Sequence, residues 1–139
     1  MRVNLAIVLA TCLALAGCAT EPVSTADARP VPADRIHSAA YSKQAPDSGT
    51  VLIKRDSGMM AAACAVQVFI NGSLIAELRT SEMLVLYMPP GEHIAGTRSS
   101  GICYSGNSEA PIVVKPRETR AYRLSIDAGG TSRIGPTAF

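Results

Sequence analysis

The chain has 139 residues, which is enough for one domain. Without its first 17 residues it holds 12 Lys and Arg against 11 Asp and Glu, a net charge of about +1, and this near-neutral balance gives no field that would attract nucleic acid. With 11 Gly, 9 Pro and no Trp, the composition suits short strands and turns better than long helices.

An apolar run covers residues 3–16 and follows Arg2. At about 14 residues it is shorter than the roughly 20 that span a bilayer, so we expect the hydrophobic part of a secretory signal, with an uncleaved transmembrane anchor as the alternative. The run ends in Leu15-Ala16-Gly17-Cys18, which resembles the lipobox of bacterial lipoproteins. The resemblance implies a signal peptide over residues 1–17, cleavage between Gly17 and Cys18, and a palmitate-type lipid anchor on Cys18.

The four cysteines separate by position. Cys12 lies in the predicted signal and Cys18 at its cleavage site, which leaves Cys64 and Cys103 in the exported part of the chain. Because exported proteins meet an oxidising compartment, we predict a Cys64–Cys103 disulfide. Two free buried thiols or a pair of metal ligands are the alternatives.

Residues 18–48 are rich in Pro, Ala, Ser and Thr and show no sustained hydrophobic period. Such a composition predicts a lipidated N-terminus followed by a flexible linker, because it offers little apolar surface to bury. As a flexible coil, thirty residues would reach about 30 Å. A short helix over residues 33–41, capped by Asp34, is the alternative.

From Gly49 onward, short runs of β-branched and aliphatic residues alternate with turn residues. The expected strands are 50–55, 65–70, 74–79, 83–88, 93–97, 111–115 and 120–126, with an edge piece at 132–134 before Pro136. Asn71-Gly72 predicts a two-residue hairpin turn. Residues 99–109 are expected to form a loop held by Cys103. Seven to eight short strands at this spacing predict an all-β fold, an antiparallel β-sandwich over residues 49–139.

The alternation of side chains predicts which of them face the core. In the hairpin these are Val66, Val68, Ile70, Leu74, Ala76 and Leu78, and in the last long strand Tyr122, Leu124 and Ile126. The nearly continuous apolar run at 83–88 predicts a central strand covered on both faces.

Three segments together resemble a motif of PEGA-type domains, which also occurs in bacterial lipoproteins of unknown function with a carboxypeptidase-regulatory-like sandwich. They are Val68-Phe69-Ile70-Asn71-Gly72, Ile75-Ala76-Glu77-Leu78 and Leu86-Tyr87-Met88-Pro89-Pro90-Gly91-Glu92-His93. The resemblance implies a sandwich over roughly residues 49–126 in an envelope setting, with His93 in a structural role. The family's tyrosine pair is matched here by Tyr122 alone.

Motifs of enzyme chemistry are missing from the sequence. It has no Gly-x-Ser-x-Gly elbow, His-Glu-x-x-His, P-loop or Gly-x-Gly-x-x-Gly, and its acidic residues are scattered singly. We therefore expect no enzyme activity, cofactor or metal. Residues 115–133 carry a local excess of three positive charges, and within them Arg120 and Arg123 are candidates to contact an anionic partner. Charge protection of an edge strand explains the same excess equally well.

These observations predict an envelope lipoprotein, anchored in the bacterial outer membrane through Cys18, with the domain facing the periplasm or the cell surface. The outer membrane is favoured by analogy, because Ala19 is not the Asp that typically retains lipoproteins in the inner membrane. The domain is expected to be non-catalytic, with other envelope proteins as partners. Carbohydrate or peptidoglycan binding is the alternative, and an exposed cluster of Tyr41, Tyr87 and Tyr104 would support it.

Overall fold

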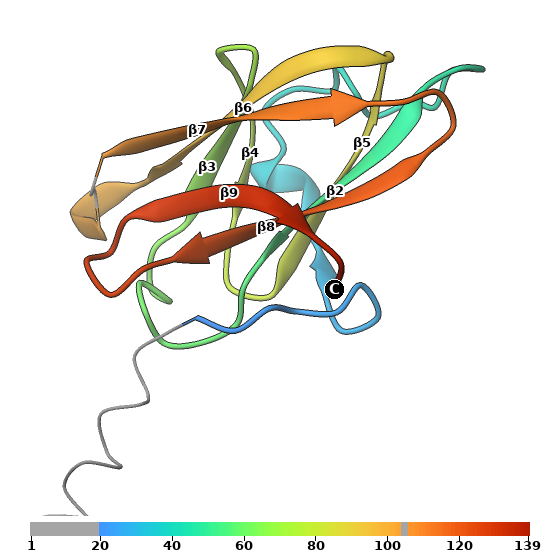
Figure 1. The fold of residues 1–139 in the computed structure, drawn as a ribbon. Helices are drawn as coiled ribbons and strands as arrows, with labels where there is room; N and C mark the ends of the chain where they lie inside the picture. Colours follow the sequence, from blue (N-terminus) through green and yellow to red (C-terminus); the bar gives the residue numbers. More distant parts are fainter. Residues whose placement is uncertain (1–19, 104–105) are drawn as a thin grey trace, which may run out of the picture.

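The computed structural model describes residues 20–103 and 106–139. Two sheets pack face to face as a β-sandwich, which confirms the predicted fold class (Figure 1). One sheet has the strand order β1-β5-β2-β8-β9 and the other the order β4-β3-β6-β7. The predicted signal peptide, Gly17 and Cys18 lie outside the described residues.

The elements follow one another along the chain as short strands with two single-turn 3-10 helices. They are β1 (Arg29–Pro30), η2 (Ala33–Arg35), β2 (Gly49–Arg55), β3 (Val66–Ile70), β4 (Ser73–Leu78), β5 (Glu82–Met88), β6 (Gly91–Ser99), η3 (Gly101–Cys103), β7 (Asn107–Val114), β8 (Thr119–Ile126) and β9 (Ser132–Thr137). The expected loop at 99–109 is shorter than predicted, because β6 and β7 continue their pairing to Arg98↔Asn107.

Most strand pairs are antiparallel, but β2 pairs with β8 and β1 with β5 in parallel. The sequence did not predict these two parallel pairs. The β2–β8 pair joins strands far apart along the chain, and all of the four-stranded sheet is formed by residues between them. Pro136 lies on β9, the edge strand of its sheet, as its missing N–H requires.

The hairpin of β3 and β4 turns at Asn71 and Gly72, which have φ of 50° and 81°. Positive φ at both central residues is the type I′ geometry that the Asn-Gly pair predicts. The register shifts after Val68, so that Ile75 is buried and Leu74 faces outward beside Phe69. The predicted inward position of Leu74 is therefore wrong, because a bulge displaces the alternation by one residue.

Aliphatic side chains from both sheets form the core, and β8 contributes Tyr122, Leu124 and Ile126 as predicted. β5 alternates between buried and half-buried side chains, so it is not covered on both faces as expected. Its half-buried side chains, Met83, Val85 and Tyr87, lie on the outer face of the sheet, away from the core.

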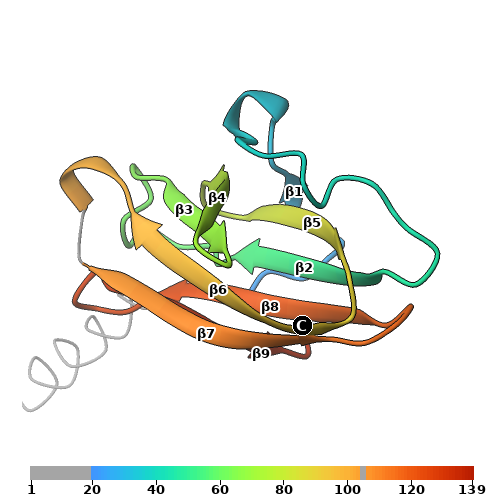
Figure 2. The same ribbon diagram turned by 90° about the horizontal axis from the view of Figure 1, so that it is seen from above.

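Residues 20–48 correct the expected flexible linker. They pack along the open side of the sandwich, beside β4 and β5 (Figure 2). Val31 joins the core, and its N–H donates to the carbonyl oxygen of Met83 at 3.1 Å. The expected helix at 33–41 is only the three-residue η2, with Pro32 rather than Asp34 at its N-cap. The folded unit thus includes residues 20–48 in addition to the predicted 49–139.

Cys64 and Cys103 form the predicted disulfide, with their Cα atoms 6.1 Å apart. The bond connects the loop before β3 to η3, across a sequence separation of 39 residues. Closing a loop of that length stabilises the fold by ~4 kcal/mol in the chain-entropy model.

Candidate functional site

The outer face of the sheet β4-β3-β6-β7 carries the best candidate for a binding site. Its strands alternate, so every second side chain leaves the core and faces outward. The outward side chains are Gln67, Phe69, Leu74, Glu77, Ile94, Arg98, Asn107, Glu109, Pro111 and Val113. Three of the apolar ones are open to solvent: Ile94 is 45% exposed, Val113 is 40% exposed, and Pro111 is exposed as well.

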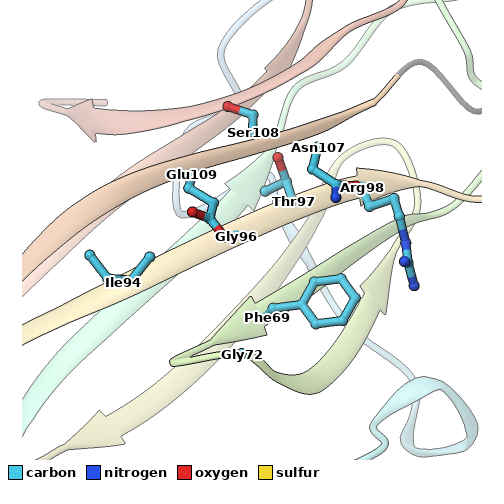
Figure 3. A pocket seen from close by; sticks show the side chains of 9 residues that line it. All are labelled: Phe69, Gly72, Ile94, Gly96, Thr97, Arg98, Asn107, Ser108 and Glu109. Carbon is cyan, nitrogen blue, oxygen red and sulfur yellow. The ribbon is translucent and has the colours of Figure 1, made fainter.

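A shallow hollow of about 180 Å³ lies in this face, and Gly96 forms its floor (Figure 3). Register places Gly96 between Phe69 of β3 and Glu109 of β7. A Cβ atom on Gly96 would lie 3.5 Å from the Cβ of Phe69 and 3.7 Å from the Cγ of Glu109. The missing side chain therefore leaves the hollow open, with an apolar wall at Phe69 and Ile94 and a carboxylate at Glu109.

A row of hydrogen-bonded polar side chains borders the hollow. Gln67 donates through Nε2 to Glu77 Oε1 at 3.0 Å, and its Oε1 accepts from Nε and Nη2 of Arg98 at 3.0 and 2.8 Å. The guanidinium carbon of Arg98 lies 5.1 Å from the centre of the Phe69 ring, a cation–π distance. The row holds Arg98 in place, and Arg98 in turn covers part of the ring of Phe69, the one aromatic side chain among the described residues that line the hollow.

The described side chains of this arrangement offer groups suited to binding. The hydroxyl of Thr97 is buried and lies 3.0 Å from that of Ser132. Glu109 is the one carboxylate that lines the hollow. An extended peptide or a small polar ligand could use the apolar wall for contact area and the Arg98 and Glu109 groups for polar contacts.

Arg120 and Arg123 do not form one cationic surface, because an odd spacing on β8 places them on opposite faces of the strand. Arg120 pairs with Glu118 at 2.6 Å, and this contact raises the pKa of Arg120. Arg123 binds both carboxylate oxygens of Asp56 at 2.7–2.9 Å, which raises its pKa as well. Both guanidinium groups are thus engaged inside the domain.

Of the three tyrosines considered for a sugar platform, the structure brings two together. Tyr41 and Tyr87 line a second, wider hollow, where the N–H of Tyr87 donates to the carbonyl of Tyr41 at 2.8 Å. Both rings are half-buried. Tyr104 lies outside the described residues.

His93 holds a turn. Its Nε2 lies 3.0 Å from the carbonyl oxygen of Pro89 and its Nδ1 lies 3.1 Å from Nδ2 of Asn71. The side-chain oxygen of Asn71 also accepts from the N–H of Ile94 at 3.0 Å. These contacts tie the β3–β4 turn to the β5–β6 turn, in keeping with a structural role.

The sequence did not predict the buried charges at the end of β2. Lys54, Arg55 and Asp56 are each 2% exposed. Arg55 donates to the carbonyl oxygens of Ala61, Cys64 and Leu78 at 2.6–2.8 Å, and burial lowers its pKa to about 10, so it stays charged at neutral pH. Lys54 and Arg55 end the strand and Asp56 follows it, and nothing in the local sequence pattern signals their partners.

Asp56 belongs to a second buried network, which includes Thr20, the first described residue. It accepts a hydrogen bond of 2.7 Å from the hydroxyl of Thr20. That hydroxyl also accepts from the N–H of Ile126 at 3.2 Å, and Arg123 donates to the carbonyl oxygen of Thr20 at 3.0 Å. Thr20 is therefore fixed to the base of the sandwich by groups from β8 and from the loop after β2.

The described ranges, 20–103 and 106–139, contain no group of three His, Cys, Asp or Glu side chains placed to hold a metal ion. In the same ranges, every helix is too short or too polar to cross a bilayer. A comparison with protein-family models and with curated proteins finds no match for this chain.

Proposed function

We propose that the protein is a membrane-anchored envelope lipoprotein whose sandwich is a non-catalytic, protein-binding domain. The anchor is Cys18, in the lipobox-like Leu15-Ala16-Gly17-Cys18. The Cys64–Cys103 disulfide supports export, because such bonds persist in oxidising compartments. Ala19 follows the cysteine in place of the Asp that typically retains lipoproteins in the inner membrane. By analogy the membrane is therefore the outer one, with the domain in the periplasm or at the cell surface.

The observation that carries the protein-binding role is the open apolar face of the four-stranded sheet. Phe69, Ile94 and Val113 lie along it with a polar row at their side. An exposed apolar centre bordered by ordered polar groups is typical of protein interfaces. The partner is another envelope protein that places an apolar side chain in the hollow above Gly96.

Binding of carbohydrate or peptidoglycan is the second candidate, and the hollow itself favours it. Glu109, Asn107 and Arg98 line the hollow and offer the polar groups that a sugar needs. A sugar also needs a free aromatic face, however, and here Arg98 stands over the Phe69 ring at 5.1 Å. The protein-binding role is therefore the better supported of the two.

The test is capture of partners from crosslinked envelopes with the tagged, processed protein. We expect Ile94→Glu to lose the captured partner, because a carboxylate in the centre of an apolar interface is desolvated without a counter-charge. Ser125→Glu is the matched control, since Ser125 faces outward from the other sheet, and it should capture as the wild type does.

Equal capture by the Ile94→Glu variant and the wild type would contradict the proposed interface. Sedimentation with purified peptidoglycan distinguishes the second candidate. Binding that Gly96→Leu abolishes, by filling the hollow, would favour the saccharide and count against a protein partner.

A further inference from the structure

One loop of the sandwich is unusually apolar and unusually exposed. Residues 58–63, between β2 and β3, read Gly-Met-Met-Ala-Ala-Ala and carry no charge. Met59 is 92% exposed, and Ala62 and Ala63 are exposed too. Ile102 in η3 is 99% exposed. We call residues 58–63 and Ile102 the apolar tip.

Covalent and hydrogen bonds hold the two parts of the apolar tip at one end of the molecule. The Cys64–Cys103 disulfide joins the residue after the loop to the residue after Ile102. Arg55 binds the carbonyl oxygens of Ala61 and Cys64, which fixes the loop on the sandwich. The exposure of Met59 and Ile102 is thus a feature of a braced surface.

The described chain begins at this same end. Ser57, next to the loop, exchanges main-chain hydrogen bonds of 2.9 and 3.1 Å with Glu21. Thr20 is fixed by Asp56, Ile126 and Arg123, as described above. In Figure 1 the blue start of the chain lies beside the green loop, with η3 and the β8–β9 turn at the same left-hand end.

Chain length then limits how far the proposed anchor can be from the apolar tip. Cys18 precedes Thr20 by two residues. Consecutive Cα atoms are about 3.8 Å apart, so the Cα of Cys18 lies within roughly 8 Å of the Cα of Thr20. Acyl chains on Cys18 would enter the bilayer at that distance from a fixed point of the sandwich.

We propose that the apolar tip rests on the lipid bilayer and inserts Met59 and Ile102 at the boundary of headgroups and acyl chains. The inference depends on the proposed lipidation of Cys18, and it adds an orientation of the domain to it. Insertion of each uncharged side chain, Met59 or Ile102, raises the membrane partition constant by roughly tenfold. The 58–63 loop carries no charge that would have to be desolvated. Because the anchor is short and lies beside the apolar tip, it keeps this surface close to the bilayer.

Tryptophan fluorescence tests this orientation cleanly, because the natural chain has no Trp. The full chain is expressed with its lipobox, purified from membranes, and reconstituted into vesicles of phosphatidylethanolamine and phosphatidylglycerol. The probes are Met59→Trp and Ile102→Trp. The matched control is Glu92→Trp, an exposed position at the start of β6, which lies near Gly49 at the opposite end of β2 from Asp56.

We expect Trp emission from both probes to shift to the blue in vesicles and to be quenched by brominated acyl chains, with neither effect in the control. Vesicle flotation of the same samples reports the anchor separately, and Cys18→Ser should stay at the bottom of the gradient. Floating protein whose probes emit and quench as the control does would overturn the orientation alone. Wild-type protein that fails to float would overturn the anchor and the orientation together.

Discussion

The ion pair between Arg35 and Glu82 shows how a single side chain joins the N-terminal segment to both sheets. Arg35 donates to both carboxylate oxygens of Glu82 at 2.5–2.6 Å and to the carbonyl of Glu77 at 3.0 Å. The two side chains are 14% and 7% exposed. Burial alone would raise the pKa of Glu82, but the hydrogen bonds from Arg35 and from the N–H of Arg79, with the charge of Arg35, outweigh it and lower that pKa.

We predict that Arg35→Met lowers the free energy of unfolding at pH 7 by about 3 kcal/mol, because it leaves a buried carboxylate without its partner. Glu82 stabilises the wild type fully above its unfolded pKa of about 4.3, and this contribution is lost as the pH falls through the lower folded pKa. The gap between wild type and variant should therefore narrow in acid. Urea unfolding at a series of pH values measures it, and a gap that is constant with pH would contradict the pairing.

At the scale of elements, residues 20–48 close the side of the sandwich that β4 and β5 leave open. The N–H of Arg29 donates to the carbonyl oxygen of Ser81 at 2.9 Å, beside β5, and that of His37 to Ile75 of β4 at 2.8 Å. These bonds occupy main-chain groups at two sheet edges, which would otherwise be open to pairing with another chain. Residues 20–48 therefore cover these two edges.

We predict that the amides of Arg29, Val31 and His37 exchange with deuterium about as slowly as those of β5, because each is hydrogen-bonded to a strand. Hydrogen-exchange mass spectrometry of the processed protein measures this, with the β5 peptides as the internal reference. Exchange of residues 29–37 at the rate of an unstructured chain would contradict this prediction and support the flexible linker expected from composition.

Local chemistry explains which elements the sequence could predict. Asn71-Gly72, the alternation in β8 and the position of Pro136 each follow from rules that act within a few residues, and all three are confirmed. The cover formed by residues 20–48 could not be predicted in this way. Its apolar contribution is spread over isolated residues such as Val23 and Val31, and Arg35 finds its carboxylate partner, Glu82, 47 residues away.

The same distinction applies to the candidate site. Position in the chain was enough to predict the Cys64–Cys103 pair. The hollow above Gly96 depends on the register of three strands, which place Phe69 and Glu109 on either side of it. Likewise, the proximity of Arg123 to Asp56 depends on the parallel pairing of β2 with β8, which a local pattern does not encode.

At the scale of the whole molecule, Thr20 already belongs to the folded unit and follows the proposed anchor by two residues. Thr20 is buried in a network with Asp56 and Arg123, so no long spacer separates the sandwich from Cys18. We therefore expect the domain to lie directly on the bilayer, with the open sheet face available to a neighbouring envelope protein. The linker expected from composition would have placed it about 30 Å away.

Neutron reflectometry of the lipidated protein on a supported bilayer tests this placement most directly, with the Cys18→Ser protein as the control that should leave no protein layer. We predict that protein density begins at the lipid headgroups without an intervening solvent layer. A hydrated gap of about 30 Å between headgroups and protein would contradict it.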